Sequence, residues 1–428
     1  MHKLFIPCLQ IAIVSCAISV SISQLFLFFT LVFFFITQKR PYFRFTPIVG
    51  LSLTIFVLYF ISYFYNLISS GDYSSITTLK GSELKDVLLW SAFLVLQGIK
   101  TEEDKKRIEK AFEILVIVLI ITGFISIFSQ IRLSRLLTDW IKPSTAWKFS
   151  HHYGDLIGLG IHLPIGLMNT HLTYGGILLL FATFVFFRFI FSVRDKKNIS
   201  YHLFVLILFG LIALLNNARS SLLGAVISVL VGFVDLLFIQ RYFSLKNTLK
   251  FISVPLIGIG LILGVLFFNE TMTKTIQPLL GQEKHTDSGR AFIWSSTYPM
   301  IAENPFLGIG PGNYAKEVEV VRKNLSIQYA ELLYFFEVTQ RGHAHNDFYH
   351  IAAIAGLPAM LVYILLASMI GYSLLLPKSS RSDNILFYGL VGFFFAGLFQ
   401  CYFQDDEVVI VFWYLLGFFH VRSLDNVK

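Results

Sequence analysis

Long runs of Phe, Leu, Ile and Val alternate with short polar segments along the whole chain. At a rise of 1.5 Å per residue, about 20 apolar residues in a helix cross the hydrocarbon core of a bilayer. The runs come close to this length, whereas a transmembrane barrel would show segments of about ten residues with alternating polarity. The pattern therefore predicts an all-α membrane protein with many spans.

Twelve spans are expected from the hydrophobic runs, and their even number places both termini on one side of the membrane. The predicted spans are residues 4–20, 22–37, 47–68, 84–99, 111–130, 172–193, 201–216, 219–240, 248–268, 350–376, 384–401 and 406–421. The first run resembles a signal peptide but shows no clear cleavage site, so we expect it to stay in the protein as the first helix.

Composition supports a membrane protein and argues against soluble classes. The 428 residues have a mean hydropathy of +0.69 and only 14% charged residues. A net charge of +8 might suggest a nucleic-acid partner, but Lys and Arg are scattered between hydrophobic runs rather than gathered on one polar surface. The only cysteines, Cys8, Cys16 and Cys401, lie inside apolar runs and predict neither a disulfide framework nor a Cys-rich zinc site.

The distribution of basic residues predicts the orientation. With the N-terminus in the cytoplasm, the short cytoplasmic segments together with Lys3 and Arg188 hold 20 of the 34 Lys and Arg, and the remainder are spread over much longer outer segments. Cytoplasmic loops carry an excess of positive charge. We therefore expect both termini to be cytoplasmic.

Two outer segments are long. Residues 131–171 contain IRLSRLLTDWIKPSTAWKF, whose apolar residues recur at helical spacing and predict a short interfacial helix. Residues 269–349 form a large insert between the ninth and tenth spans, within which residues 314–338 have the pattern of an amphipathic helix. Residues 1–428 are expected to form one membrane domain that carries this outer loop.

Two arginines are candidates for binding an anion. Arg219 begins a span directly after a very short outer turn, and an arginine at such a boundary either reaches into the interface or faces a cavity or ligand. Arg290 lies four residues before Trp294 and ahead of GIGPG, which lacks the Gly-Lys-Ser/Thr ending of a nucleotide-binding loop. Arg290 taken alone could equally be a solvated loop charge.

The stretch RGHAHNDFYH, residues 341–350, gathers three histidines at the outer end of the tenth span. Histidine can accept a proton near neutral pH, so this stretch could supply a general base. His343 and His345 could instead be ordinary interfacial residues. The three histidines could also bind a metal, although no Cys or carboxylate at ligand spacing completes a set.

The motifs taken together resemble the O-antigen ligase/polymerase superfamily. They are ARSSLLG at the head of a span, R-x-x-x-W followed by ENPFLGIGPGN, and HAHNDF followed by AGLP, and they cover residues 214–232 and 287–360. A large loop between the ninth and tenth of twelve spans is similar to the layout of that family. The resemblance implies a glycosyltransferase of the bacterial inner membrane whose active site faces the periplasm.

The resemblance also implies roles for individual residues. Arg219 and Arg290 fall on the family's basic residues that are thought to engage an undecaprenyl-diphosphate-linked glycan donor, and His345 falls on the proposed base. His343, Asn346 and His171 are expected to support these three. The family needs no cofactor or metal, and two guanidiniums beside a departing diphosphate suit a metal-independent, inverting displacement.

Three functions remain open from the sequence. The first is a ligase in lipopolysaccharide biosynthesis that transfers the glycan to a lipid A–core acceptor. The second is an O-antigen or exopolysaccharide polymerase, whose acceptor is a second lipid-linked repeat. The third is a transporter for a lipid-linked sugar, in which charges would line a pathway at the midplane of the membrane.

Overall fold

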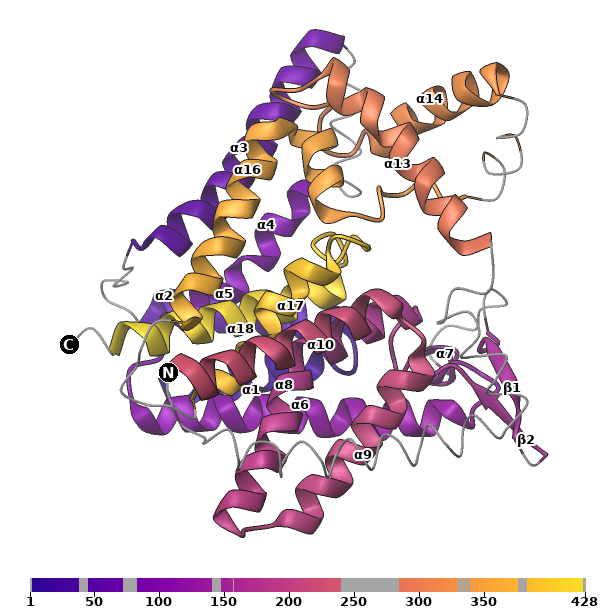
Figure 1. Cartoon of the computed structure of the whole chain (residues 1–428). Helices are drawn as coiled ribbons and strands as arrows, with labels where there is room; N and C mark the ends of the chain where they lie inside the picture. The colour runs from indigo at the N-terminus through magenta and orange to yellow at the C-terminus, as the bar shows by residue number, and fades with distance from the viewer. Residues whose placement is uncertain are drawn as a thin grey trace.

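A computed structural model of the chain is helical almost throughout (Figure 1). It describes residues 2–37, 45–71, 83–140, 148–156, 158–239, 285–329, 333, 336, 339–375 and 383–425. The predicted ninth span, residues 248–268, lies outside the described residues.

Seven of the described helices are long and apolar enough to cross a membrane, which confirms an all-α, multi-pass membrane protein. The first part of the chain forms α1 (His2–Ser15), α2 (Val20–Thr37), α3 (Pro47–Ser70) and α6 (Glu102–Ile127). The middle forms α8 (His171–Asp195), α9 (Ile199–Asn216), α10 (Arg219–Val234) and the π-helical turn η3 (Asp235–Ile239). The last part forms α13 (His285–Glu303), α14 (Tyr314–Gln328), α16 (Asp347–Leu375) and α18 (Asp406–Asp425).

Two predicted spans are divided into short helical pieces, which corrects the expectation from hydropathy. Residues 84–99 divide into η2 (Glu83–Lys85), α4 (Asp86–Leu89) and α5 (Ser91–Leu96). Residues 384–401 divide into η5 (Asp383–Leu386), α17 (Gly389–Ala396) and a loop. Hydropathy indicates burial in an apolar environment but does not indicate whether a helix is continuous. At a break, packed neighbours can supply the hydrogen bonds that the backbone loses.

Local signals explain where several helices begin. Thr46 precedes α3 in an extended conformation and accepts a hydrogen bond from Val49 N, and Pro47 occupies the first turn. Thr101 caps α6 by accepting from Asp104 N at 3.1 Å. Such hydroxyl caps satisfy backbone donors that have no partner inside the helix.

The core surrounds α18, which crosses the middle of the molecule (Figure 1). Its residues 408–419 are buried on every side, including Trp413 and Tyr414. The surrounding helices instead expose large apolar side chains, such as Phe35 on α2, Phe204 on α9 and Leu361 on α16. A band of exposed apolar groups on the outer helices is what a lipid-facing surface requires.

The outer segment 131–171 differs in part from its prediction. A short helix, α7 (Leu133–Thr138), is present as expected, but a two-stranded antiparallel hairpin follows it, formed by β1 (His152–Leu156) and β2 (Leu159–His162). Gly158, between the strands, has a φ of 77°, which a residue with a Cβ rarely adopts. The helical spacing of apolar residues did not predict this hairpin.

Candidate functional site

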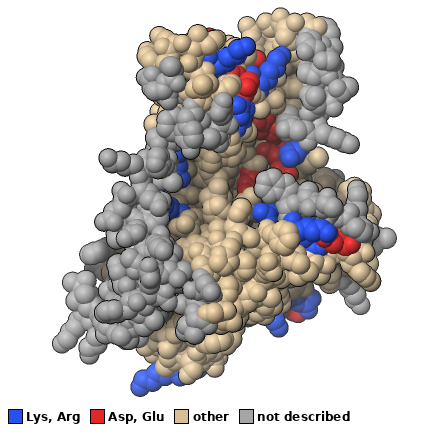
Figure 2. Space-filling model, turned by 90° about the vertical axis from the view of Figure 1, so that its right-hand side faces the viewer, with Lys and Arg blue, Asp and Glu red and all other residues tan. Residues whose placement is uncertain are grey.

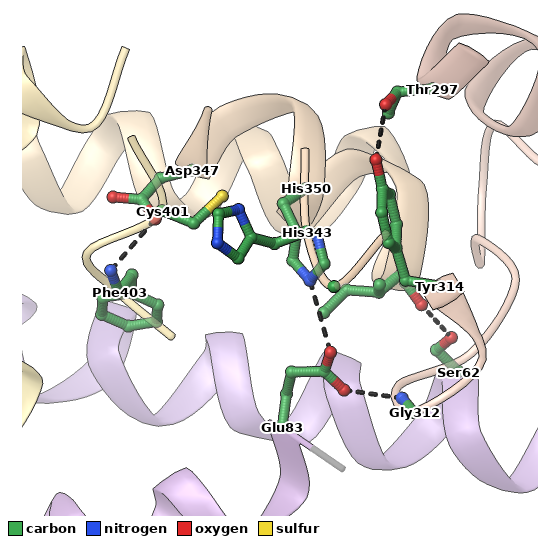
Figure 3. Close-up of polar contacts among 12 residues, drawn as sticks. Ser62, Glu83, Thr297, Gly312, Tyr314, His343, Asp347, His350, Cys401 and Phe403 are labelled. Carbon is green, nitrogen blue, oxygen red and sulfur yellow. Dashed lines mark hydrogen bonds and ion pairs between the residues drawn. The ribbon is translucent and has the colours of Figure 1, made fainter. Parts of the chain in front are cut away.

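Residues 397–405, between α17 and α18, contact the N-terminal turns of three other helices. Three hydrogen bonds contribute to these contacts: Thr173 Oγ1 to Asp405 Oδ2 at 2.6 Å, Ser220 Oγ with Tyr402 Oη at 2.9 Å, and Phe403 N to Asp347 Oδ1 at 3.0 Å. Figure 3 shows the last of them. The helices α8, α10 and α16 therefore begin around one loop. Since the N-terminus of a helix carries partial positive charge, this end of the molecule favours anionic groups.

Residues 339–346, called here the histidine loop, present His345 to the 397–405 loop. His345 has a φ of 49°, and its Nδ1 is hydrogen-bonded to Oε1 of Gln400. An amide oxygen can only accept, so Nδ1 of His345 carries the proton. In the neutral imidazole Nε2 then has a free lone pair, and among the described residues it has no hydrogen-bond partner.

The surroundings of His345 favour the neutral imidazole. Burial lowers the pKa of His345, and the positive charges of Arg290 and Arg322 lower it further. The hydrogen bond with Gln400 acts in the opposite direction. At neutral pH the side chain is therefore able to accept a proton at Nε2.

His343 stands directly beside His345. The two ring centroids are 4.5 Å apart, and Nδ1 of His343 accepts the backbone N–H of His345 at 3.2 Å. Burial lowers the pKa of His343 to about 3, and the nearby imidazoles of His345 and His350 act in the same direction. His343 is thus a neutral group that holds the backbone of its neighbour.

Asn346 starts α16 and serves a structural purpose. Its Oδ1 accepts from Tyr349 N at 3.0 Å, which caps the helix, and its Nδ2 donates to Leu398 O at 3.0 Å. Its backbone N–H lies 3.3 Å from Sγ of Cys401. Asn346 therefore fixes His345 against the 397–405 loop.

The two predicted anion ligands lie on different helices. Arg290 belongs to α13, which packs against α16, and its charge acts on His345. Arg219 is the first residue of α10, next to Ser220 and its bond to the 397–405 loop. Its half-buried side chain makes no hydrogen bond or ion pair with the described residues.

His171, the weakest candidate, is the first residue of α8 and half-buried. It lies two residues before Thr173, which binds Asp405, but has no hydrogen bond to any described residue. His171 and His345 therefore lie at the same end of the bundle, but no contact between them is found among the described residues.

The GIGPG segment forms the glycine loop, defined here as residues 307–313. Gly308, Gly310 and Gly312 all have positive φ, between 64° and 88°. The N–H groups of residues 309 and 310 donate to Ala353 O at 2.8 Å and Ile354 O at 3.1 Å, carbonyls next to the kink of α16 at Gly356. The glycine loop thus donates hydrogen bonds to carbonyl groups of α16 beside its break.

Glu83 of η2 completes the glycine loop (Figure 3). Its carboxylate accepts from Gly312 N at 2.6 Å and from His350 Nε2 at 3.3 Å. Burial acts to raise the pKa of Glu83, but the bond and charge of His350 outweigh it, so the pKa is lowered. The N–H of Gly312, which could have bound a phosphate, is therefore already bonded to a protein carboxylate.

Sequence reasoning missed Glu83, Gln400 and Arg322. Glu83 comes just before the span predicted at residues 84–99, and Gln400 lies within the span predicted at residues 384–401. Arg322 shares a face with Tyr314 and Val318 in the predicted amphipathic helix of residues 314–338. Arg322 is fully buried. A charged residue that interrupts an apolar helix face is the one signal that could have identified it.

One side of the molecule is hollowed between its upper and lower parts, with acidic atoms inside the hollow and basic atoms around it (Figure 2). Over the described ranges, no group of three or more His, Cys, Asp and Glu side chains is arranged to hold a metal ion.

Comparison with known proteins supports the motifs. Residues 203–364, from α9 to the second part of α16, match the family model described as O-antigen ligase. This region contains Arg219, Arg290 and the histidine loop. A search of curated proteins gave no significant match. The family match confirms that the chain resembles the O-antigen ligase/polymerase superfamily of membrane glycosyltransferases.

Proposed function

We propose that the protein is a metal-independent, inverting glycosyltransferase that moves a glycan from an undecaprenyl-diphosphate donor to a lipid A–core acceptor. The observation that carries the proposal is the hydrogen bond of His345 Nδ1 to Gln400, which leaves Nε2 unprotonated in a neutral imidazole. The matched family, described as O-antigen ligase, supports the choice of acceptor.

The proposed reaction is one displacement at the anomeric carbon. The acceptor hydroxyl oxygen forms a bond to that carbon while the bond from the carbon to the phosphate oxygen breaks. The lipid diphosphate leaves with the electron pair, and the hydroxyl proton moves to Nε2 of His345. Attack opposite the leaving group inverts the anomeric centre.

Arg219 and Arg290 are proposed to stabilise the departing diphosphate. Negative charge builds on that group as the bond breaks, and guanidiniums placed against it lower the barrier where water is partly excluded. Two observations support this role. The charge of Arg290 acts on His345, and Arg219 is half-buried without an acidic partner among the described residues.

The proposed topology follows from the charge distribution. Both termini would be cytoplasmic and the histidine loop would face the periplasm, so that donor and acceptor meet at the outer leaflet of the inner membrane. One membrane domain would carry the outer loop of residues 269–349. His171, Arg219 and Asn346 stand at the N-terminal ends of α8, α10 and α16 rather than along their middle, which disfavours a transport pathway.

The test is transfer in vitro from a defined lipid-linked donor to two acceptors in parallel: lipid A–core and a second lipid-linked repeat. A ligase forms product with lipid A–core. Product with the second lipid-linked repeat alone would mean that the protein is a polymerase instead. Arg290→Ala should abolish transfer in inserted protein. Normal transfer by this variant would overturn the diphosphate role. Inhibition by EDTA that one divalent ion reverses would overturn metal independence.

A further inference from the structure

Arg322 is a charged side chain in an unusual place. It lies in the middle of α14, is fully buried, and its guanidinium stands 5.3 Å from the ring centre of Phe292. Nε donates to Ser296 Oγ at 3.1 Å, and Nη2 has no partner among the described residues. None of the described carboxylates forms an ion pair with it.

A buried cation without an ion pair is costly. Removing a charge from water costs several kcal/mol, even after the protein relaxes. Glu319 lies one turn earlier on α14 and could have paired with Arg322, yet it pairs with Arg341. The fold therefore keeps a positive charge inside the packed face of α14 that is hydrogen-bonded but has no ion-pair partner among the described residues, which packing alone does not require.

The hydrogen bonds of Arg322 lead to His345. Nη1 donates to Thr339 O at 3.2 Å and to Gln340 O at 2.8 Å. The side chain of Gln340 continues the chain by donating to His343 O at 2.7 Å. His343 in turn accepts the N–H of His345. One guanidinium thus holds the start of the histidine loop, whose other end carries the proposed base.

We propose that Arg322 is a positioning residue that acts through His345, fixing the histidine loop and placing a permanent positive charge near the imidazole. The proposal rests on the proposed function, in which His345 is the base. Arginine stays protonated in proteins, so its charge is constant over the working pH range.

The charged and titratable groups that act on His345 come from three elements. His343 lies in the same loop, Arg290 comes from α13 and Arg322 from α14, while the neutral Gln400 contacts it from the 397–405 loop. Both arginines disfavour the imidazolium. Since Arg290 is also proposed to bind the donor, Arg322 is the cation that remains when donor phosphates neutralise Arg290.

The experiment measures the titration of His345 directly, by NMR of protein with labelled histidine in nanodiscs, with His345→Gln to assign the signal. Arg322→Met removes the charge and the hydrogen bonds but keeps an apolar side chain of similar length. Arg322→Lys keeps the charge but cannot span the same acceptors. Arg107→Met is the control for removing a paired arginine, because Arg107 is exposed on α6 and pairs with Glu103.

In Arg322→Met we expect the pKa of His345 to rise, because a positive charge that disfavours the imidazolium is removed. Its kcat should fall about tenfold or more, with KM for the donor nearly unchanged. Arg322→Lys should keep the titration near that of the wild type and still lose kcat. Arg107→Met should change neither the titration of His345 nor kcat.

An unmoved His345 signal in Arg322→Met would overturn the electrostatic part, and full kcat in Arg322→Lys would overturn the positioning part. If Arg322→Met does not fold, the wild type decides, since a His345 pKa at or above its ordinary value would contradict the proposal. Transfer by His345→Gln would instead refute the proposed base, and the titration would still report on Arg322.

Discussion

The glycine loop and the histidine loop lie at the same end of α16, and both attract attention in the sequence, but they use their polar groups differently. In the glycine loop, the N–H groups of residues 309, 310 and 312 donate to protein acceptors. In the histidine loop, hydrogen bonds fix the backbone and Nδ1 of His345 while Nε2 has no partner among the described residues.

The difference shows how to separate a structural motif from a chemical one. Glycines before a helix suggest a phosphate cradle, but an N–H that already binds a carboxylate or a helix carbonyl has nothing left for a ligand. A histidine with one nitrogen oriented and the other open retains its chemistry. The comparison predicts that changes in the two loops affect different quantities.

The largest effect is expected from His345→Gln. Loss of the proposed base should lower the transfer rate by about 10²–10⁴-fold, because the acceptor hydroxyl must then lose its proton to water. The measurement is kcat with a lipid-linked donor in detergent or nanodiscs. The unfolding temperature should stay near that of the wild type. A variant that loses both stability and activity would contradict the assignment of a chemical role to the histidine loop and a structural role to the glycine loop.

Gly308→Ala should instead act on stability. At a φ of 64° an added Cβ is strained, and it would lie 2.5 Å from the backbone nitrogen of Ala355. We expect the free energy of unfolding to fall by about 2–4 kcal/mol, measured by thermal or denaturant unfolding.

Two other glycines separate the causes of that loss. Gly71 has the same φ of 64° but nothing within 4 Å of an added Cβ, so Gly71→Ala should cost only the strain, about 1 kcal/mol. Gly342, in the histidine loop, has ordinary φ and only the side chain of Gln340 nearby, so its alanine variant should be nearly neutral. Equal losses in all three would refute the steric argument.

Gln400→Leu should lower the rate about tenfold, since Nδ1 of His345 loses the acceptor that fixes its tautomer. The pH dependence should also change. The neutral imidazole is the active form, so activity falls as the pH drops through the pKa of His345. Because the Gln400 bond acts to raise this pKa, removing it should move the acid limb to lower pH.

Gln404→Leu is the matched control, because this residue is in the same loop and its amide nitrogen has no partner among the described residues. It should leave both the rate and the acid limb unchanged. A shift of the acid limb to higher pH in Gln400→Leu would contradict the direction of the hydrogen bond, and would resemble the change expected for Arg322→Met.

The sequence predicted the class of fold well because hydrophobic runs directly report burial in an apolar solvent. It could not predict the breaks at residues 84–99 and 384–401, where packing replaces helical hydrogen bonds. The same limit applies to the site. Motifs predicted Arg290 and His345 as site residues, but the contacts of Gln400 and Arg322 join residues far apart in sequence, 55 positions in the case of His345 and Gln400. No local pattern encodes such partners.

The smallest effect on transfer is expected from Glu83→Gln. A glutamine keeps one acceptor oxygen but turns its amide toward one of the two donors, Gly312 N or His350 Nε2. We expect a loss of about 1–2 kcal/mol in the free energy of unfolding and a transfer rate within a few-fold of the wild type.

Glu319→Gln serves as the control for removing a carboxylate, because Glu319 is exposed and pairs with Arg341 at the surface, where an ion pair contributes about 0–1 kcal/mol. The decisive result is the rate of folded Glu83→Gln. If transfer is lost while the protein stays folded and inserted, the glycine loop takes part in the chemistry after all. Glu83 would then belong with His345 as a functional group rather than with Gly308 as a structural one.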